Sequence, residues 1–275
     1  MHDFSLVCPT MKNISYISNP KMSPWRKVSL ASWKPTGDSS TYCLEDVLID
    51  NLLSYCQTKE ISINSFFVKA ISNTIANHPK INSTVRWGKI FQREDISVFF
   101  HTIISAQADD LSGIVIKRAH QKPLIEVNQE FIEKATLAKN GVNDYVESKA
   151  IINKLPQYLV KPMLRLYSFL TYTLNWNSRL FKSQPDAYGS VMLTSVGGIG
   201  ISNALCPISP YTRVPMVISM GKIEPKPVVV NGAVEVRNVI TLGFTFDHRI
   251  MDGIHFSEFF FCLKGYLLNP ESLEI

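Results

Sequence analysis

Apolar and polar residues along the chain alternate between strand-like and helix-like patterns. Apolar side chains recur with a period near two from Tyr42 to Ile49, and they run almost unbroken from Ile96 to Ile104. These patterns predict a half-buried strand and an inner strand. Helical spacing instead marks a helix that ends at Asn77 and an amphipathic helix over Leu124 to Ala138. Strands and helices therefore alternate, which is typical of an α/β protein.

Short polar side chains are expected to begin the first two helices. Asp50 precedes a helix from Asn51 to Thr58, and either Asn64 or Ser65 precedes the helix that ends at Asn77. Asp, Asn and Ser are favoured at such positions because their side chains accept hydrogen bonds from unpaired backbone N–H groups. The second helix should bury one face, made of Phe67, Ala70, Ile71, Thr74 and Ile75.

Two hairpins and a C-terminal helix complete the pattern. One hairpin should turn at Trp87-Gly88, and the pair Asn231-Gly232 favours a tight turn in the second. After Gly253, apolar residues at helical spacing form a stripe that should pack on the sheet: Phe256, Phe259, Phe260, Leu263 and Leu267. Together these elements predict a two-layer α/β sandwich, with helices on one face of a large mixed β-sheet.

Length and composition fit one large domain. The 275 residues are 45% hydrophobic and 19% charged, enough to bury a sizeable core. Residues 1–25 read as an irregular lead-in, and no linker or repeat divides residues 26–275. The net charge of +5 suits an anionic ligand but is too small and dispersed to indicate nucleic-acid binding.

Cysteine usage and the N-terminus favour a reducing, cytoplasmic compartment. The five cysteines are odd in number and widely spaced, without a CxxC pair. We therefore expect idle or buried thiols and no bound metal. The first residues lack the apolar run of a secretory signal.

The end of the last predicted strand carries the strongest chemical signal. After the strand-like run from Val239 to Phe246, the chain continues as Asp247-His248-Arg249-Ile250-Met251-Asp252-Gly253. A histidine at a strand end can take up and return a proton, because imidazole titrates near neutral pH. Asp252, four residues later, can hold a neighbouring cation or loop and so steady His248.

This segment resembles the active-site signature of the catalytic domain of 2-oxoacid dehydrogenase dihydrolipoamide acyltransferases, a fold shared with chloramphenicol acetyltransferase. The segment from Val191 to Gly200 is similar to the family's strand that ends in a hydroxyl residue and a Gly-x-x-Gly turn. Pro215 to Gly221 resembles the strand that follows. The resemblance implies acyl transfer between coenzyme A and a thiol such as that of dihydrolipoamide on a separate protein, without a covalent acyl-enzyme.

The same resemblance implies a role for each site residue. His248 corresponds to the general base, and Thr194 stands where the family usually has a serine that stabilises the oxyanion. Asp252 takes the position of the acidic or amide residue that steadies the site. A shift of one residue would make Ser195 the donor instead, although such a shift reverses the face of a strand. The implied assembly is a homotrimer or a multiple of trimers, in which adjacent subunits supply the histidine and the hydroxyl.

Two functional interpretations stay open from the sequence. The chain shows no lipoyl or subunit-binding domain, so we expect a free-standing catalytic domain whose acceptor is a thiol, an amine or a hydroxyl. The alternative is a non-catalytic scaffold that keeps the fold for assembly. Antibiotic-acetylating relatives have His-His where this chain has Asp247-His248, which argues against a resistance enzyme.

A segment within residues 150–185 departs from the family pattern. From Leu155 to Lys182 it has apolar residues at helical spacing, interleaved with aromatic side chains and flanked only by basic ones. The stripe consists of Leu159, Met163, Leu166, Leu170 and Leu174, and the cations are Lys154, Lys161, Arg165, Arg179 and Lys182. Such a helix either docks on protein or lies on an anionic membrane surface. Its uncharged run is too short to span a bilayer.

Overall fold

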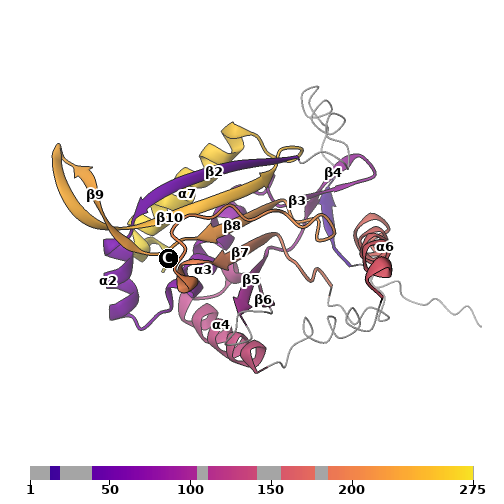
Figure 1. The fold of residues 1–275 in the computed structure, drawn as a ribbon, viewed down its shortest axis with the longest axis horizontal. Helices are drawn as coiled ribbons and strands as arrows, with labels where there is room; N and C mark the ends of the chain where they lie inside the picture. The colour runs from indigo at the N-terminus through magenta and orange to yellow at the C-terminus, as the bar shows by residue number, and fades with distance from the viewer. Residues whose placement is uncertain (1–12, 19–38, 104–110, 141–155, 177–184, 275) are drawn as a thin grey trace, which may run out of the picture.

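A mixed β-sheet forms the centre of the molecule in this computed structural model (Figure 1). Residues 13–18, 39–103, 111–140, 156–176 and 185–274 are described; most of the predicted lead-in, Lys154, Arg179 and Lys182 lie outside them. The strand order is β2 (Ser40–Leu48), β10 (Ala233–Asp247), β8 (Met216–Met220), β7 (Val191–Ser195), β5 (Ser97–Ile103) and β6 (Leu111–Lys117), with β9 (Glu224–Val230) paired to β10. β7 runs parallel to both of its neighbours and the other pairs are antiparallel, so the predicted mixed sheet is confirmed.

Helices cover one face of this sheet, as predicted. They are α2 (Asp50–Thr58), α3 (Ile63–Asn77), α4 (Leu124–Lys139) and α7 (Gly253–Leu268), with short turns η1 (Ala119–Gln121) and η5 (Pro270–Leu273). The expected face of α3 and the expected stripe of α7 are buried throughout. The ring of Phe244 on β10 contacts the rings of Phe256, Phe259 and Phe260, which fixes α7 against the sheet.

Both predicted hairpins are confirmed, and one belongs to a second, smaller sheet. That sheet has the order β1 (Tyr16–Ser18), β4 (Lys89–Arg93), β3 (Ser83–Arg86). Trp87 and Gly88 have φ of 50° and 67°, and Asn231 and Gly232 have φ of 51° and 85°. Positive φ at both central residues is the geometry of a type I′ turn, which matches the twist of the strands it joins.

The predicted helix caps are wrong. α2 begins at Asp50 itself, and its carboxylate accepts hydrogen bonds from the backbone and side-chain amides of Asn238 on β10, at 3.2 and 2.8 Å. α3 begins at Ile63, so neither Asn64 nor Ser65 precedes it. A tertiary partner on the neighbouring strand has replaced the local capping bond of Asp50, and sequence spacing does not reveal such a partner.

The extra segment forms α6 (Gln157–Ser168) followed by a π-helical turn, η2 (Phe169–Thr173), on the opposite side of the molecule from α2 (Figure 1). Its buried residues are Tyr167, Ser168, Thr171 and Tyr172, and not the predicted stripe. Leu159, Leu166 and Leu174 are 40%, 52% and 44% exposed. Leu159 and Leu166 lie within α6, before the π-helical turn, so this exposure belongs to the regular helix itself. Docking on another subunit and contact with a membrane therefore both stay predictions.

Candidate active site

The strand end that carries His248 is held on both sides. β10 pairs with β2 through Asp247 and with β8 through Phe246. The backbone N–H of His248 then donates to the carbonyl of Ser39 at 2.8 Å. The histidine is half-buried. Its backbone position is therefore fixed by the sheet, while its side chain keeps access to solvent.

The residues on either side of His248 form an ion pair. The guanidinium of Arg249 donates to both carboxylate oxygens of Asp247, with Nη2 2.6 Å from Oδ2. The hydroxyl of Ser39 donates to the same carboxylate at 3.1 Å. The hydrogen bonds to Asp247 raise the pKa of Arg249 above its usual value. The pair braces the turn that contains the histidine.

Asp252 caps α7 and contacts a second histidine. Its Oδ1 accepts from the backbone N–H of His255 at 3.3 Å and lies 2.6 Å from Nδ1 of the same residue. Sequence analysis did not single out His255. The available signal was its position three residues after the cap, a spacing that places both side chains in the first turn of the helix. These contacts join Asp252 to the first turn of α7.

Thr194 lies near the end of β7, on the sheet face that the helices leave uncovered. Along β7, Leu193 belongs to the core beneath the helices, and Met192 belongs to a separate cluster on the other face. Because side chains alternate along a strand, Thr194 shares the face of Met192 and Ser195 the face of Leu193. Thr194 is half-buried and is paired with His101 on β5 and Ser219 on β8.

One chain does not bring Thr194 and His248 together. Thr194 pairs with Ser219, and Ser219 pairs with Gly243 on β10. Gly243 precedes His248 by five residues of strand, about 17 Å, and two strand spacings add about 10 Å sideways. Groups that act on one substrate atom must come within hydrogen-bond reach, roughly 3 Å. The two residues therefore lie toward opposite ends of the sheet.

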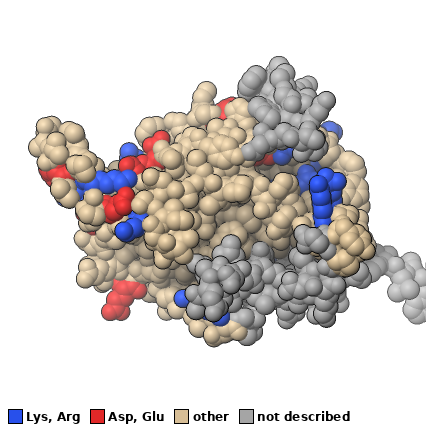
Figure 2. Space-filling model, viewed as in Figure 1, with Lys and Arg blue, Asp and Glu red and all other residues tan. Residues whose placement is uncertain are grey.

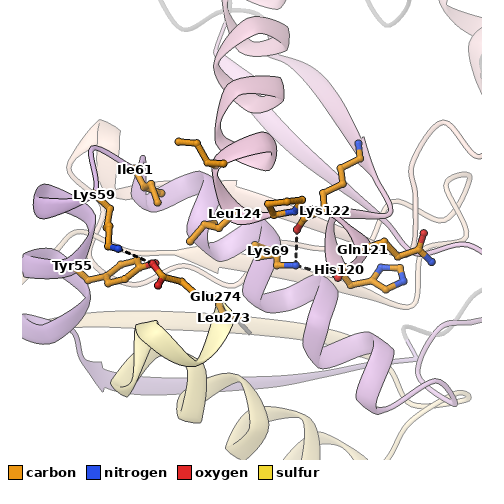
Figure 3. Close-up of a pocket in the computed structure, with 12 residues that line it drawn as sticks. Tyr55, Lys59, Ile61, Lys69, His120, Gln121, Lys122, Leu124, Leu273 and Glu274 are labelled. Atoms are coloured by element: carbon orange, nitrogen blue, oxygen red, sulfur yellow. Dashed lines mark hydrogen bonds and ion pairs between the residues drawn. The ribbon is translucent and has the colours of Figure 1, made fainter.

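A cavity of about 500 Å³ lies elsewhere, between α2, α3, η1, α4 and η5 (Figure 3). Its lining does not include Thr194, His248 or Asp252. Lys69 donates to three carbonyl oxygens, those of Ala119, His120 and Lys122, at 2.8–3.2 Å. Burial lowers the pKa of this amine. The lysine fastens η1 to α3, which makes this a structural feature.

Other charged groups in the described ranges do not gather into a metal centre. No group of three or more His, Cys, Asp or Glu side chains there could hold a metal ion. On the face drawn in Figure 2, Lys and Arg side chains form small separate groups, several of them beside acidic ones. Ion pairs such as Lys226–Asp46, at 3.1 Å, partly neutralise them.

Most of the chain, including the strand end that carries His248, matches a known protein family. The family described as "2-oxoacid dehydrogenases acyltransferase (catalytic domain)" matches residues 42–152 and 181–275, so the chain belongs to this family. The interval between the two matched parts falls within the segment that departs from the family pattern. The bounds of the domain, 26–275, and of its insertion stay a prediction.

A curated relative supports the same family. The chain is 26% identical over 191 residues to the lipoamide acyltransferase component of the branched-chain alpha-keto acid dehydrogenase complex of Bacillus subtilis. That alignment covers 69% of this chain but 35% of the relative. The chain thus spans well under half the length of this relative.

Solved structures share the fold. The cubic core of a pyruvate dehydrogenase multienzyme complex has a TM-score of 0.65 at 14% identity, covering 94% of this chain and 96% of that one. The Azotobacter vinelandii dihydrolipoamide acetyltransferase, studied for the catalytic role of a serine, a histidine and an asparagine, gives 0.63 at 15%, covering 86% and 84%. A chloramphenicol acetyltransferase gives 0.52 at 14%, covering 94% and 100%. The predicted fold class is therefore confirmed.

Proposed function

We propose that this domain transfers an acyl group between coenzyme A and the thiol of an acceptor, with His248 as the general base. A thiol with a pKa of about 8.5 is mostly protonated at neutral pH, so its attack needs a base. His248 is the histidine in a strand-end motif, and hydrogen bonds on both sides hold it in place. The observation that carries the proposal is this fixed, half-buried histidine within the family's signature.

The reaction needs one group that takes up and returns a proton and a second group that donates a hydrogen bond to the oxyanion. His248 takes the proton of the acceptor thiol while the sulfur attacks the carbonyl carbon of the acyl thioester. The hydroxyl of Thr194 donates a hydrogen bond to the tetrahedral oxyanion. Collapse of that intermediate breaks the bond to the sulfur of coenzyme A, and His248 returns the proton to the departing thiolate. No bond between protein and acyl group forms.

The active site would lie between subunits of a homotrimer or a multiple of trimers. His248 and Thr194 are too far apart within one chain to act on one carbonyl, whereas a neighbouring copy can supply the missing group. Asp252 would position the turn that contains His248, because its carboxylate holds the start of α7 directly after that turn. A stable monomer or dimer in light scattering at micromolar concentration would contradict the proposed assembly.

The acceptor is proposed from the family. Dihydrolipoamide on a separate protein is the acceptor that the family suggests, and the A. vinelandii structure is of an acetyltransferase acting on it by name. Incubation of the purified protein with acetyl-, succinyl- and longer acyl-CoA, with dihydrolipoamide as acceptor, tests this directly. Release of free coenzyme A that depends on the acceptor and on His248 supports the proposal. A protein that is inactive with every donor contradicts dihydrolipoamide as the acceptor, and inactivity with amine and hydroxyl acceptors as well favours the non-catalytic scaffold.

We also propose that the exposed side of α6 and η2 contacts an anionic membrane surface. Tyr158, Leu166 and Phe169 are 77%, 52% and 42% exposed, and Lys161 and Arg165 are exposed as well. Residues 157–176 contain no acidic side chain, so the whole segment carries one sign of charge. Apolar side chains flanked by cations suit a helix that lies flat on anionic lipid. No helix among the described residues is long and apolar enough to cross a bilayer.

A further inference from the structure

His101 lies directly beside Thr194 on the sheet face opposite the helices. β5 and β7 run parallel, with His101 opposite Thr194 and Phe99 opposite Met192. Directly paired residues point to the same face, with Cβ atoms about 5 Å apart. Phe99 and Met192 form part of an apolar cluster on that face. His101 and Thr194 therefore make the next, polar row, toward the carboxyl end of both strands.

The ring of Phe99 restricts where the imidazole of His101 can lie. The rings of Phe99 and His101 meet edge to face, with centroids 4.9 Å apart. His101 is paired on its other side with Gly113 of β6, and a Cβ atom at Gly113 would collide with the end of the Phe99 ring. The Phe99 ring thus fills the space on the β6 side of His101. On its other side His101 is paired directly with Thr194 of β7.

Ser219, the other residue paired with Thr194, uses its hydroxyl in the fold. Ser219, opposite Thr194 on β8, donates its hydroxyl to the carbonyl of Ala204, which crosses the sheet above Gly243. Its single O–H is therefore committed to the backbone. Among the side chains paired with Thr194, His101 is the one that combines an N–H donor with a half-buried position.

We propose that His101 is a second oxyanion donor, whose imidazole N–H binds the same thioester oxygen as the hydroxyl of Thr194. This inference rests on the proposed acyl transfer. Both groups come from one subunit and from adjacent strands, so two donors about 5 Å apart at Cβ can converge on one oxygen. The negative charge that develops on that oxygen is then shared between an N–H and an O–H. The base, His248, approaches from the neighbouring subunit.

Replacement of His101 by phenylalanine tests this role. Phenylalanine keeps a planar ring against Phe99 but removes the N–H donor. We expect kcat to fall roughly tenfold or more with the KM for acyl-CoA within about twofold, because a donor that binds the oxyanion acts mainly in the transition state. His101→Gln, which keeps an N–H, should recover part of the loss. The matched control is His78→Phe at the C-terminal end of α3, which should leave kcat unchanged.

A double-mutant cycle with Thr194→Val separates a shared oxyanion site from a structural effect. Two donors to one oxygen should be coupled, so His101→Phe should cost less in the Thr194→Val background than in the wild type. A kcat for His101→Phe within twofold of the wild type overturns the inference. So does a loss that appears only in KM, or one that is equal in both backgrounds.

A ligand-based measurement keeps the two proposals distinguishable. A ketone analogue of acetyl-CoA, with a methylene in place of the thioester sulfur, should shift the imidazole ¹⁵N signals of His101 and leave those of His78 unchanged. An active enzyme in which His101 does not respond contradicts this inference alone. A protein that neither turns over acyl-CoA nor responds to the analogue contradicts the proposed function and this inference together.

Discussion

The two ends of the central sheet each hold proposed site residues, and they are built differently. At one end, His248 follows β10 in a turn braced by an ion pair, a backbone hydrogen bond and the capped start of α7. At the other end, Thr194 and His101 lie on adjacent strands, on the sheet face opposite the helices. One end thus fixes its backbone, while the other exposes a row of polar donors. Separate ends of this kind suit a site completed by a second copy of the chain.

The largest effect should come from His248 itself. His248→Ala removes the proposed base, and we expect acyl transfer to fall on the order of 100- to 10,000-fold. The fold should persist because the backbone bonds of this turn do not use the imidazole. His78→Ala is the matched control for turnover, and circular dichroism with light scattering checks fold and assembly. Near-normal turnover in His248→Ala would contradict the assignment of His248 as the general base.

Thr194 should come next. Thr194→Val keeps the branched shape but loses the hydroxyl, so kcat should fall roughly tenfold or more with little change in affinity for coenzyme A. Thr194→Ser keeps the donor and should be tolerated. Steady-state kinetics of the two variants checks the expectation. Equal activity of the valine variant would mean that Thr194 is only a strand residue.

Asp252 should show a smaller effect, mainly on stability. Asp252→Ala removes the cap of α7 and the contact to His255, and should lower the free energy of unfolding by about 1 kcal/mol. Asp252→Asn keeps an acceptor and should lose less. Urea denaturation of both variants measures the difference. An alanine variant as stable as the wild type would show that the cap contributes nothing at this end of the sheet.

The smallest effect is expected at α6, away from both ends of the sheet. Lys161→Glu with Arg165→Glu should abolish salt-sensitive binding to anionic liposomes, because each cation contributes about 1 kcal/mol near such a surface. The kcat should stay unchanged. Absence of wild-type binding to these liposomes at low salt would contradict the membrane proposal. Burial of Leu166 in an assembled trimer would instead assign this surface to a neighbouring subunit.

Local patterns predicted most of the fold. The faces of α3 and α7 and the turn at Asn231-Gly232 follow from spacing and from φ preferences within a few residues. What covers the exposed leucines of α6 could not be predicted, because helical spacing identifies an apolar stripe but not its partner. Asp50 failed as a cap because its partner, Asn238, is far from it in the sequence although close in space.

The candidate site likewise contains residues that local motifs predict and one residue that they do not. His248 and Thr194 could be found from contiguous motifs, each at the end of an apolar strand. His101 could not, because its relation to Thr194 depends on the pairing of β5 with β7. Parallel pairs are joined by long connections, so their register is not visible in either strand alone.

Mixed assemblies test most directly whether the two ends meet between subunits. His248→Ala and Thr194→Val chains, each impaired alone, are co-expressed with different tags and purified together. If adjacent chains supply the two groups, random mixing in equal amounts leaves about one quarter of the sites with both an intact histidine and an intact hydroxyl. We predict that the mixture recovers about a quarter of wild-type activity, well above the sum of the separate variants. Activity no greater than that sum would contradict a site shared between subunits.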